Sequence, residues 1–141
     1  MAVDPLREYP GYALRRVSAA LMAALAKDLA KWDLRPSEAS VLLVIEANPS
    51  ITQSEIGRLL DIAGANMAPL IARLSSRELL ERRAVDGRSQ SLKLTASGRT
   101  LTLAARKAMR AQEERTLAKI PAEHRASFME ALRALWPDES T

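Results

Sequence analysis

The chain contains no cysteine and only one histidine, His124, among its 141 residues. The lack of cysteine excludes disulfides, thiol nucleophiles, thiol redox sensors and thiolate zinc sites. A single histidine leaves most acid–base and metal-binding schemes without their usual side chains. The sequence also has no phosphate-cradling glycine loop and no cofactor fingerprint. We therefore expect no enzymatic activity, no cofactor and no metal site.

Long apolar runs and aromatic residues are scarce too. No run approaches the roughly 18 residues that span a bilayer, and the N-terminus lacks a signal-peptide pattern. We therefore expect a cytoplasmic protein without membrane contact. Aromatic residues make up 4% of the chain, while alanine and leucine dominate its apolar content. That composition favours a helical core.

The apolar periodicity predicts a mainly α chain with one small β-hairpin. After an extended arm over residues 1–11, a helix is expected over 12–32, and a second helix begins at Pro36. Near the C-terminus, Pro121 and Glu123 open the last helix. The two ends of the chain are therefore predicted to be helical, with shorter elements between them.

The middle of the chain has the clearest start and turn signals. Thr52 and Glu55 form a capping box that begins a third helix. A tight turn then leads to a fourth helix over 63–76. Next come strands over 79–83 and 91–95, which flank the turn signal Asp86-Gly87. A fifth helix, which Thr95 can cap, follows the second strand.

Both end helices carry apolar stripes that the small middle module cannot fully cover. An uncovered stripe on a helix needs a partner. We infer a homodimer in which both ends interleave with those of a second copy. A monomeric helical bundle is the alternative.

Positive charge is plentiful: the net charge is +4 and the pI about 9.8. Between positions 82 and 110, eight basic residues accompany one acid, Asp86. A solvated basic face is one interpretation, but a basic stretch beside a hairpin tip favours nucleic acid as partner. The eight are Arg82, Arg83, Arg88, Lys93, Arg99, Arg106, Lys107 and Arg110.

The fourth helix has the side chains of a helix that reads double-stranded DNA. Small residues let its backbone approach the floor of the major groove, and Asn66 is suited to a bidentate pair with adenine. Pro69 either bends this helix or confines regular helix to the residues after it; a loop before a shorter helix is the alternative. The candidate DNA contacts are Ala63, Gly64, Ala65, Asn66 and Ala68.

Two arginines are candidate partners for the DNA backbone and the minor groove. Arg73 is expected opposite the core face of the fourth helix, where it can reach a phosphate. Arg88 at the hairpin tip can enter a narrow minor groove, with Asp86 holding its guanidinium through a charge-assisted bond. The alternatives are a solvated Arg73 and a type I′ turn that happens to carry a basic residue.

These segments together resemble the MarR family of winged helix-turn-helix regulators. The resemblance covers residues 33–100 and rests on LRPSEASVL, TQSEIGRLL, NMAPLIARL, LLERR and DGRSQSLKLTASGR. It implies a winged helix-turn-helix with N- and C-terminal dimerisation helices, in a triangular homodimer. The corresponding divisions are an arm and dimerisation helix (1–34), a DNA-binding domain (35–98) and C-terminal dimerisation helices (99–141).

The resemblance also implies a function. Family members repress or activate nearby genes, and a small aromatic or phenolic ligand in a cleft between the two parts often relieves this control. Asp86 and Arg88 match wing residues of the family, Arg73 matches its late recognition-helix arginine, and Thr95 matches its helix cap. We therefore expect a sequence-specific, dimeric DNA-binding regulator, a repressor released by such a ligand.

Three positions depart from the family pattern. Ala63 replaces the usual serine cap, Pro69 replaces a frequent arginine, and Gly87 replaces the first wing arginine. Fewer phosphate contacts predict a lower affinity or a weaker salt dependence. The peroxide-sensing branch needs a reactive cysteine and zinc-responsive members need histidine clusters, so we expect neither mechanism.

A ligand cleft in this family would have walls from the first, second and fifth helices. The candidate effector contacts are Tyr12, Arg16, Trp32 and Ser40, which offer a cation for a carboxylate and rings for stacking. A winged-helix regulator without a small-molecule effector is the main alternative. An enzyme and a helical scaffold that binds only protein are two others.

Overall fold

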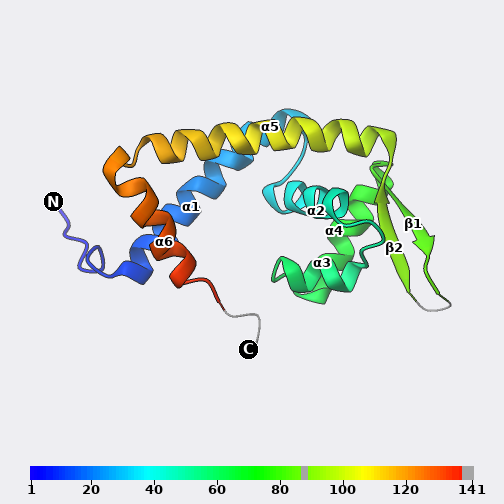
Figure 1. Ribbon diagram of the computed structural model, residues 1–141, viewed down its shortest axis with the longest axis horizontal. Helices are drawn as coiled ribbons and strands as arrows, with labels where there is room; N and C mark the ends of the chain where they lie inside the picture. Colours follow the sequence, from blue (N-terminus) through cyan, green and yellow to red (C-terminus); the bar gives the residue numbers. More distant parts are fainter. Residues whose placement is uncertain (87–88, 138–141) are drawn as a thin grey trace. The chain divides into compact units, whose positions relative to one another are not determined.

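The computed structural model describes residues 1–86 and 89–137 (Figure 1). The chain divides into two compact units, Met1–Ala108 and Met109–Thr141. The three divisions expected from the sequence stay predictions. The elements are α1 (Pro10–Leu29), η1 (Ala30–Trp32), α2 (Pro36–Ala47), α3 (Gln53–Leu59), α4 (Gly64–Ser76), β1 (Leu80–Ala84), β2 (Gln90–Leu94), α5 (Ala96–Ala118), η2 (Ala122–His124) and α6 (Arg125–Ala134).

The core of the first unit lies among α2, α3, α4 and the hairpin. The strands β1 and β2 pair antiparallel, from Leu80 opposite Leu94 to Ala84 opposite Gln90. The sheet is extended at the segment before α3, where the Leu92 N–H donates to the Ile51 carbonyl at 2.9 Å. The largest fully buried apolar side chains are Leu29, Leu42, Ile56, Met67, Ile71, Leu74, Leu92 and Val41.

The predicted capping box of the third helix is confirmed. The Glu55 N–H donates to the Thr52 hydroxyl at 3.4 Å, and the Thr52 N–H donates to Glu55 Oε2 at 2.7 Å. Gly57 lets this short helix pack closely on the turn that follows, because a β-carbon there would lie 3.0 Å from the Ile62 carbonyl oxygen. The close packing of α3 on the turn before α4, and with it the angle between the two helices, therefore requires glycine at position 57.

Thr95 caps α5, as the sequence predicted. Its hydroxyl accepts the Gly98 N–H at 3.0 Å and donates to the Glu78 carbonyl at 2.7 Å. The Thr95 N–H also donates to the Leu79 carbonyl at 3.1 Å. The start of α5 is thus tied to the turn between α4 and β1, so the hairpin is anchored at its base.

One helix boundary and the course of one helix differ from expectation. The first helix begins at Pro10 rather than Tyr12, because a proline at the first helical position lacks only an N–H that has no helical acceptor. The fourth helix runs unbroken from Gly64 to Ser76 with Pro69 inside it. Proline there removes one donor to Ala65, and Ala65 is exposed, so water can satisfy that carbonyl.

Apolar side chains remain uncovered in each unit of the single chain. On α1, Leu25 and Leu29 are buried, whereas Leu14 and Val17 are exposed. In the second unit the exposed large apolar residues are Phe128, Met129, Leu135 and Trp136. Among the described residues, none of the helices combines the length and the apolar character that a bilayer crossing requires.

Candidate nucleic-acid interface

The first turns of α4 form an exposed surface above a buried side. The inward face consists of Met67, Ile71 and Leu74, all buried. The five residues that were expected to contact DNA lie together on the exposed side of this helix start. Those residues, all exposed, are Ala63, Gly64, Ala65, Asn66 and Ala68.

Polar groups on this surface are available to a ligand. The backbone N–H of Asn66 donates to the Ala63 carbonyl at 2.8 Å, but within the described part of the chain its side-chain amide has no hydrogen-bond partner. Ala63 stands at the N-cap without a side-chain cap bond. The first N–H groups of a helix have no helical acceptor, so those of Gly64 and Ala65 point outward. Free N–H groups at a helix N-terminus favour an anion such as phosphate.

Arg73 does not lie where the sequence analysis placed it. Its guanidinium forms an ion pair with Glu38, and its Nη2 lies 3.0 Å from Asp33 Oδ1 and 3.1 Å from the Asp33 carbonyl oxygen. The Glu38 hydrogen bond is the main cause that raises the pKa of Arg73. Arg73 is thus turned toward α2 instead of lying opposite the core face. Its guanidinium is already bonded to Glu38 and Asp33, so it is not free to bind a phosphate.

The acceptor of Arg73 was missed by the sequence analysis. Glu38 on α2 is only 2% exposed, and its Oε1 accepts the Arg35 N–H at 3.0 Å. Arg77 adds two bonds nearby, from Nη1 to the Asp33 carbonyl at 2.7 Å and from Nη2 to the Trp32 carbonyl at 2.8 Å. The available signal was the four-residue spacing of two arginines, which places both on one helix face.

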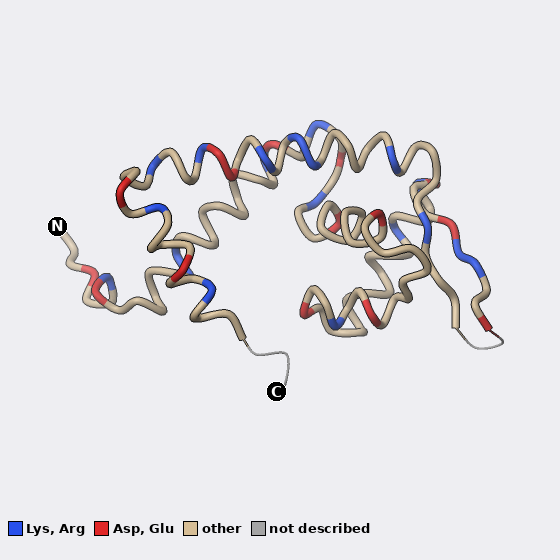
Figure 2. The backbone as a smooth tube through the Cα atoms, in the orientation of Figure 1, with Lys and Arg blue, Asp and Glu red and all other residues tan. Residues whose placement is uncertain are grey.

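The hairpin carries two arginines on β1 and Lys93 on β2, while its tip lies partly outside the described residues. Gly87 and Arg88 belong to that undescribed part, so the expected insertion of Arg88 into the minor groove remains a prediction. Asp86 Oδ1 accepts the Ser89 N–H at 2.8 Å. Figure 2 shows basic residues between acidic ones along β1 and the turn, and Arg82 and Arg83 are exposed there.

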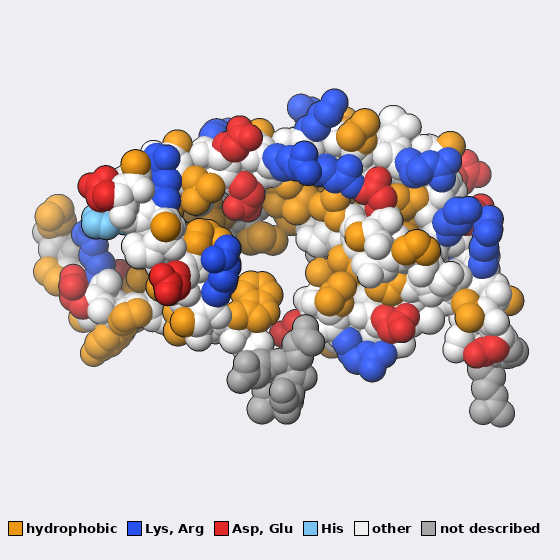
Figure 3. All heavy atoms as spheres, in the orientation of Figure 1, with side chains coloured by type: hydrophobic (Ala, Val, Ile, Leu, Met, Phe, Trp, Pro, Cys, Tyr) orange, Lys and Arg blue, Asp and Glu red, His pale blue; other side chains and the backbone are white. Residues whose placement is uncertain are grey.

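A polar groove of about 520 Å³ joins the start of α3 to the hairpin. Gln53 and Ser54 line one side, and Arg82 and Gln90 line the other. The Arg82 Nη1 donates to Gln90 Oε1 at 3.4 Å. Such amide, hydroxyl and guanidinium donors bind phosphate oxygens in protein–DNA interfaces. Basic side chains also follow α5 beyond the hairpin base (Figure 3).

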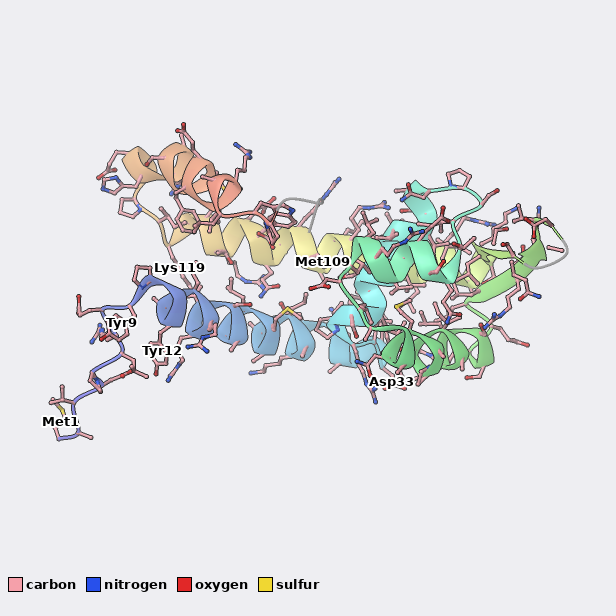
Figure 4. The ribbon with its side chains drawn as sticks, turned by 90° about the horizontal axis from the view of Figure 1, so that it is seen from below. Met1, Tyr9, Tyr12, Asp33, Met109 and Lys119 are labelled. Atoms are coloured by element: carbon pink, nitrogen blue, oxygen red, sulfur yellow. The ribbon has the colours of Figure 1, made fainter. Side chains whose placement is uncertain are left out.

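The four residues expected to bind an effector are not brought together within one chain. The Arg16 guanidinium donates to the Tyr12 hydroxyl at 3.1 Å near the start of α1. Trp32 follows the far end of that helix, and the Ser40 hydroxyl donates to the Pro36 carbonyl at 3.1 Å. The helix between Tyr12 and Leu29 spans about 26 Å at 1.5 Å per residue. Figure 4 shows Tyr12 near the start of α1 and Asp33 beyond the other end of that helix.

A separate cavity of about 300 Å³ lies between the end of α2, β2 and the first turns of α5. Its apolar lining includes Ile45, Leu92 and Leu94, and its basic lining includes Lys93 and Arg99. None of the four expected effector residues lines it. The assignment of those four residues to an effector cleft therefore stays a prediction.

Comparison with known proteins places this geometry in a family. The MarR family description matches residues 32–89. The HTH-type transcriptional repressor Rv2887 of Mycobacterium tuberculosis is 29% identical over 130 residues, which cover 91% of this chain and 94% of that protein.

Solved structures agree over nearly the whole chain. The transcriptional repressor CouR bound to a 23-mer DNA duplex is 30% identical, with a TM-score of 0.86 and coverage of 96% of this chain and 97% of that one. CouR bound to p-coumaroyl-CoA is 29% identical, with a TM-score of 0.85 and 96% coverage of each chain. PcaV from Streptomyces coelicolor, in complex with its natural ligand, is 25% identical, with a TM-score of 0.75 and 96% coverage of each. The exposed recognition helix, the β-hairpin wing and these likenesses together establish that the chain belongs to the MarR family of winged-helix, DNA-binding transcriptional regulators.

Proposed function

We propose that the protein is a homodimeric repressor that binds a pseudo-palindromic operator and releases it when a small aromatic ligand binds. The observation that carries this proposal is the exposed first turn of α4, in which Asn66 has an unpaired side-chain amide among the described residues. The 30% identical repressor CouR, solved on a DNA duplex, supports it.

DNA recognition is assigned mainly to α4. Its small exposed residues let the backbone approach the major groove, and the Asn66 amide can donate to and accept from one adenine. The uncapped N–H groups at Gly64 and Ala65 and the polar groove at Arg82 are suited to phosphates on either side. The wing contact of Arg88 and Asp86 completes the interface as a prediction from the sequence.

The homodimer is supported by the apolar residues left uncovered on α1 and in the second unit. Leu135 is 65% exposed and Trp136 is 77% exposed in the single chain. Such large apolar surfaces near a chain end favour a protein partner. In a two-fold dimer the recognition helices would enter successive major grooves, with half-sites about 10 bp apart centre to centre.

The ligand class is inferred from relatives. CouR is known bound to p-coumaroyl-CoA and PcaV to its natural ligand. We infer for this chain a phenolic or other aromatic acid, or the CoA thioester of one. Release would follow if the ligand favours a dimer whose recognition helices are wrongly spaced for DNA. A regulator with no small-molecule effector, governed by its abundance, is the alternative.

The test uses a duplex that the purified protein selects from a randomised pool. Gel shift with that duplex should show specific binding, and p-coumarate or p-coumaroyl-CoA should release the DNA and raise the melting temperature. If neither compound, nor a panel of aromatic acids, changes melting or binding while the duplex is still bound, the effector-free alternative holds. Absence of any selected duplex would contradict operator binding itself.

A further inference from the structure

We propose that Asp33, Glu38, Arg73 and Arg77 form an arginine clamp that positions the recognition helix for DNA without touching the DNA. The clamp joins α4 to the corner where η1 leads into α2. The proposal rests on the proposed function only in taking operator affinity as its main readout. It reassigns Arg73 from a phosphate contact to a positioning residue.

Arg73 and Arg77, which form the α4 side of the clamp, fix the rotation of that helix about its axis. Arg73 and Arg77 are four residues apart on α4, so their side chains leave the same face. Arg73 reaches the Glu38 carboxylate, and both arginines reach the Asp33 carbonyl, at 3.1 and 2.7 Å. Planar guanidinium groups fix the direction of their acceptors better than apolar contacts do. Rotation of α4 about its axis would break these bonds together.

The receiving side of the clamp is built from a helix end. The η1 helix ends at Trp32, and Asp33 then adopts a left-handed conformation with φ of 51°. This conformation leaves the Trp32 and Asp33 carbonyls at the C-terminal end of a helix, where cationic side chains are favoured. Arg77 Nη2 takes the Trp32 carbonyl at 2.8 Å. Figure 4 shows Asp33 at this corner, far along the chain from Tyr12.

Glu38 makes the clamp hard to open. The carboxylate is 2% exposed, and each of its oxygens has a partner: the Arg35 N–H on Oε1 and Arg73 on Oε2. Removal of one member of a buried ion pair leaves an uncompensated charge, which is strongly unfavourable. Arg73 therefore cannot swing to a phosphate without leaving Glu38 Oε2 without its partner, because the other cation near this carboxylate, Arg35 Nε, lies 4.0 Å away on Oε1. Its side chain is 27% exposed, so a nearby phosphate would meet a guanidinium already engaged.

The clamp also explains how α4 can be held at a fixed distance from its twin. It fastens α4 to η1, which continues α1, and α1 carries exposed apolar residues proposed to contact the second copy. The buried contacts of Met67, Ile71 and Leu74 hold α4 on the core, but apolar burial is not directional. The arginine bonds supply the angle, and the spacing of two recognition helices depends on that angle.

A phosphate role for Arg73 makes different predictions. Loss of one phosphate contact lowers the slope of log affinity against log salt by about 0.9 for duplex DNA. It also leaves Glu38 without influence on DNA binding. A positioning role predicts that Glu38 and Arg73 variants lose affinity alike, that their effects do not add, and that the salt slope is unchanged.

The experiment measures affinity for the selected duplex with the full-length protein, over a range of salt and well below every melting temperature. The variants are Glu38→Gln, Arg73→Gln, their double variant and Asp33→Asn. Asp33 is 84% exposed and asparagine tolerates its backbone conformation, so this last variant folds. Arg82→Gln, in the polar groove, serves as the phosphate-type comparator. Lys119→Gln serves as the charge control, because Lys119 is exposed and lies outside the basic stretch of residues 82–110.

The clamp predicts that Glu38→Gln and Arg73→Gln each weaken binding by about tenfold, that the double variant is no weaker than the worse single one, and that the salt slope holds. Asp33→Asn should weaken binding less, also at constant slope. Arg82→Gln should lower the slope, and Lys119→Gln should change little. Wild-type affinity in both Glu38→Gln and Asp33→Asn, or a slope change confined to Arg73→Gln, overturns the clamp.

If the wild-type protein selects no duplex, the proposed function fails separately, and amide hydrogen exchange then decides the clamp. Asp33→Asn and Glu38→Gln should speed exchange along α4 while leaving the second unit unchanged. Equal exchange in α4 would overturn the clamp without reference to DNA.

Discussion

A β-carbon at Gly98 would overlap the carbonyl oxygen of Leu79. This close approach seats the first turn of α5 on the turn between α4 and β1, where Thr95 and Ser97 both donate to the Glu78 carbonyl. The base of the hairpin and the end of α4 therefore share one support, and a change at that support should reach both.

Gly98→Ala should destabilise the fold by about 1–3 kcal/mol, as overpacking of a tight contact does. Gly11→Ala is the matched control, because nothing lies within 4 Å of a β-carbon there. In the helix α1, that control should gain about 0.5–1 kcal/mol. Chemical denaturation of both variants checks the prediction, and equal stabilities would show that the Leu79 contact can relax.

Asn66→Ala should leave stability unchanged and weaken binding to the selected duplex. The residue is exposed and its amide is unpaired among the described residues, whereas a bidentate base contact contributes about 1–3 kcal/mol of discrimination. Competition gel shifts against unrelated duplex measure that loss. A parallel loss on unrelated DNA would identify Asn66 as a backbone contact instead. Thr100→Ala, exposed on α5, is the control that should bind normally.

Arg88→Ala tests the wing. If the Arg88 guanidinium enters a minor groove, its removal should weaken operator binding, most clearly for duplexes with a narrow, A·T-rich flank. Affinity is compared on selected duplexes with A·T-rich and G·C-rich flanks. Unchanged affinity on both at moderate salt would remove the wing from the mechanism.

The α3 capping box should respond to acid. The Thr52 backbone N–H and then its hydroxyl lower the pKa of Glu55 below its ordinary value. A carboxyl group whose pKa is lower in the folded state than in the unfolded state stabilises the fold. That stabilisation is fully present at pH values above the unfolded-state pKa of about 4.3, and it is lost as the pH falls through the folded-state pKa.

Glu55→Gln should therefore remove part of the loss of stability on acidification from about pH 5 to pH 3. Urea denaturation of the variant and the wild type at several pH values in that window provides the comparison. Parallel pH profiles would mean that the exposed Thr52–Glu55 hydrogen bonds add no stability beyond what the same groups gain from bonds to water.

Local signals in the sequence sufficed for much of the fold. The Thr52–Glu55 capping box and the Thr95 cap involve partners three residues apart, so periodicity and residue type reveal them. Arg73 and Glu38 are 35 positions apart, and their pairing depends on how α2 and α4 cross, which no local pattern encodes. The unbroken course of α4 through Pro69 likewise depends on the solvent around Ala65.

The effector assignment stays a prediction for a related reason. Tyr12 lies in the first turn of α1 and Trp32 follows the end of that helix, with about 26 Å of helix between Tyr12 and Leu29. Sequence position alone therefore does not place the two side chains in one pocket. The exposed start of α4 was predictable because the apolar positions Met67, Ile71 and Leu74 fix the buried face of that helix and leave the small residues and Asn66 on its other side. Residue types therefore predicted the exposed surface at the start of α4, whereas the proximity of the proposed effector residues depends on tertiary distances.

The most direct test of the central claim is a hydroxyl-radical footprint of the protein on its selected duplex. Two copies that each place α4 in a major groove predict two protected patches on one face, about 10 bp apart, both weakened by Asn66→Ala. A single patch, or protection that Asn66→Ala leaves intact, would contradict the account.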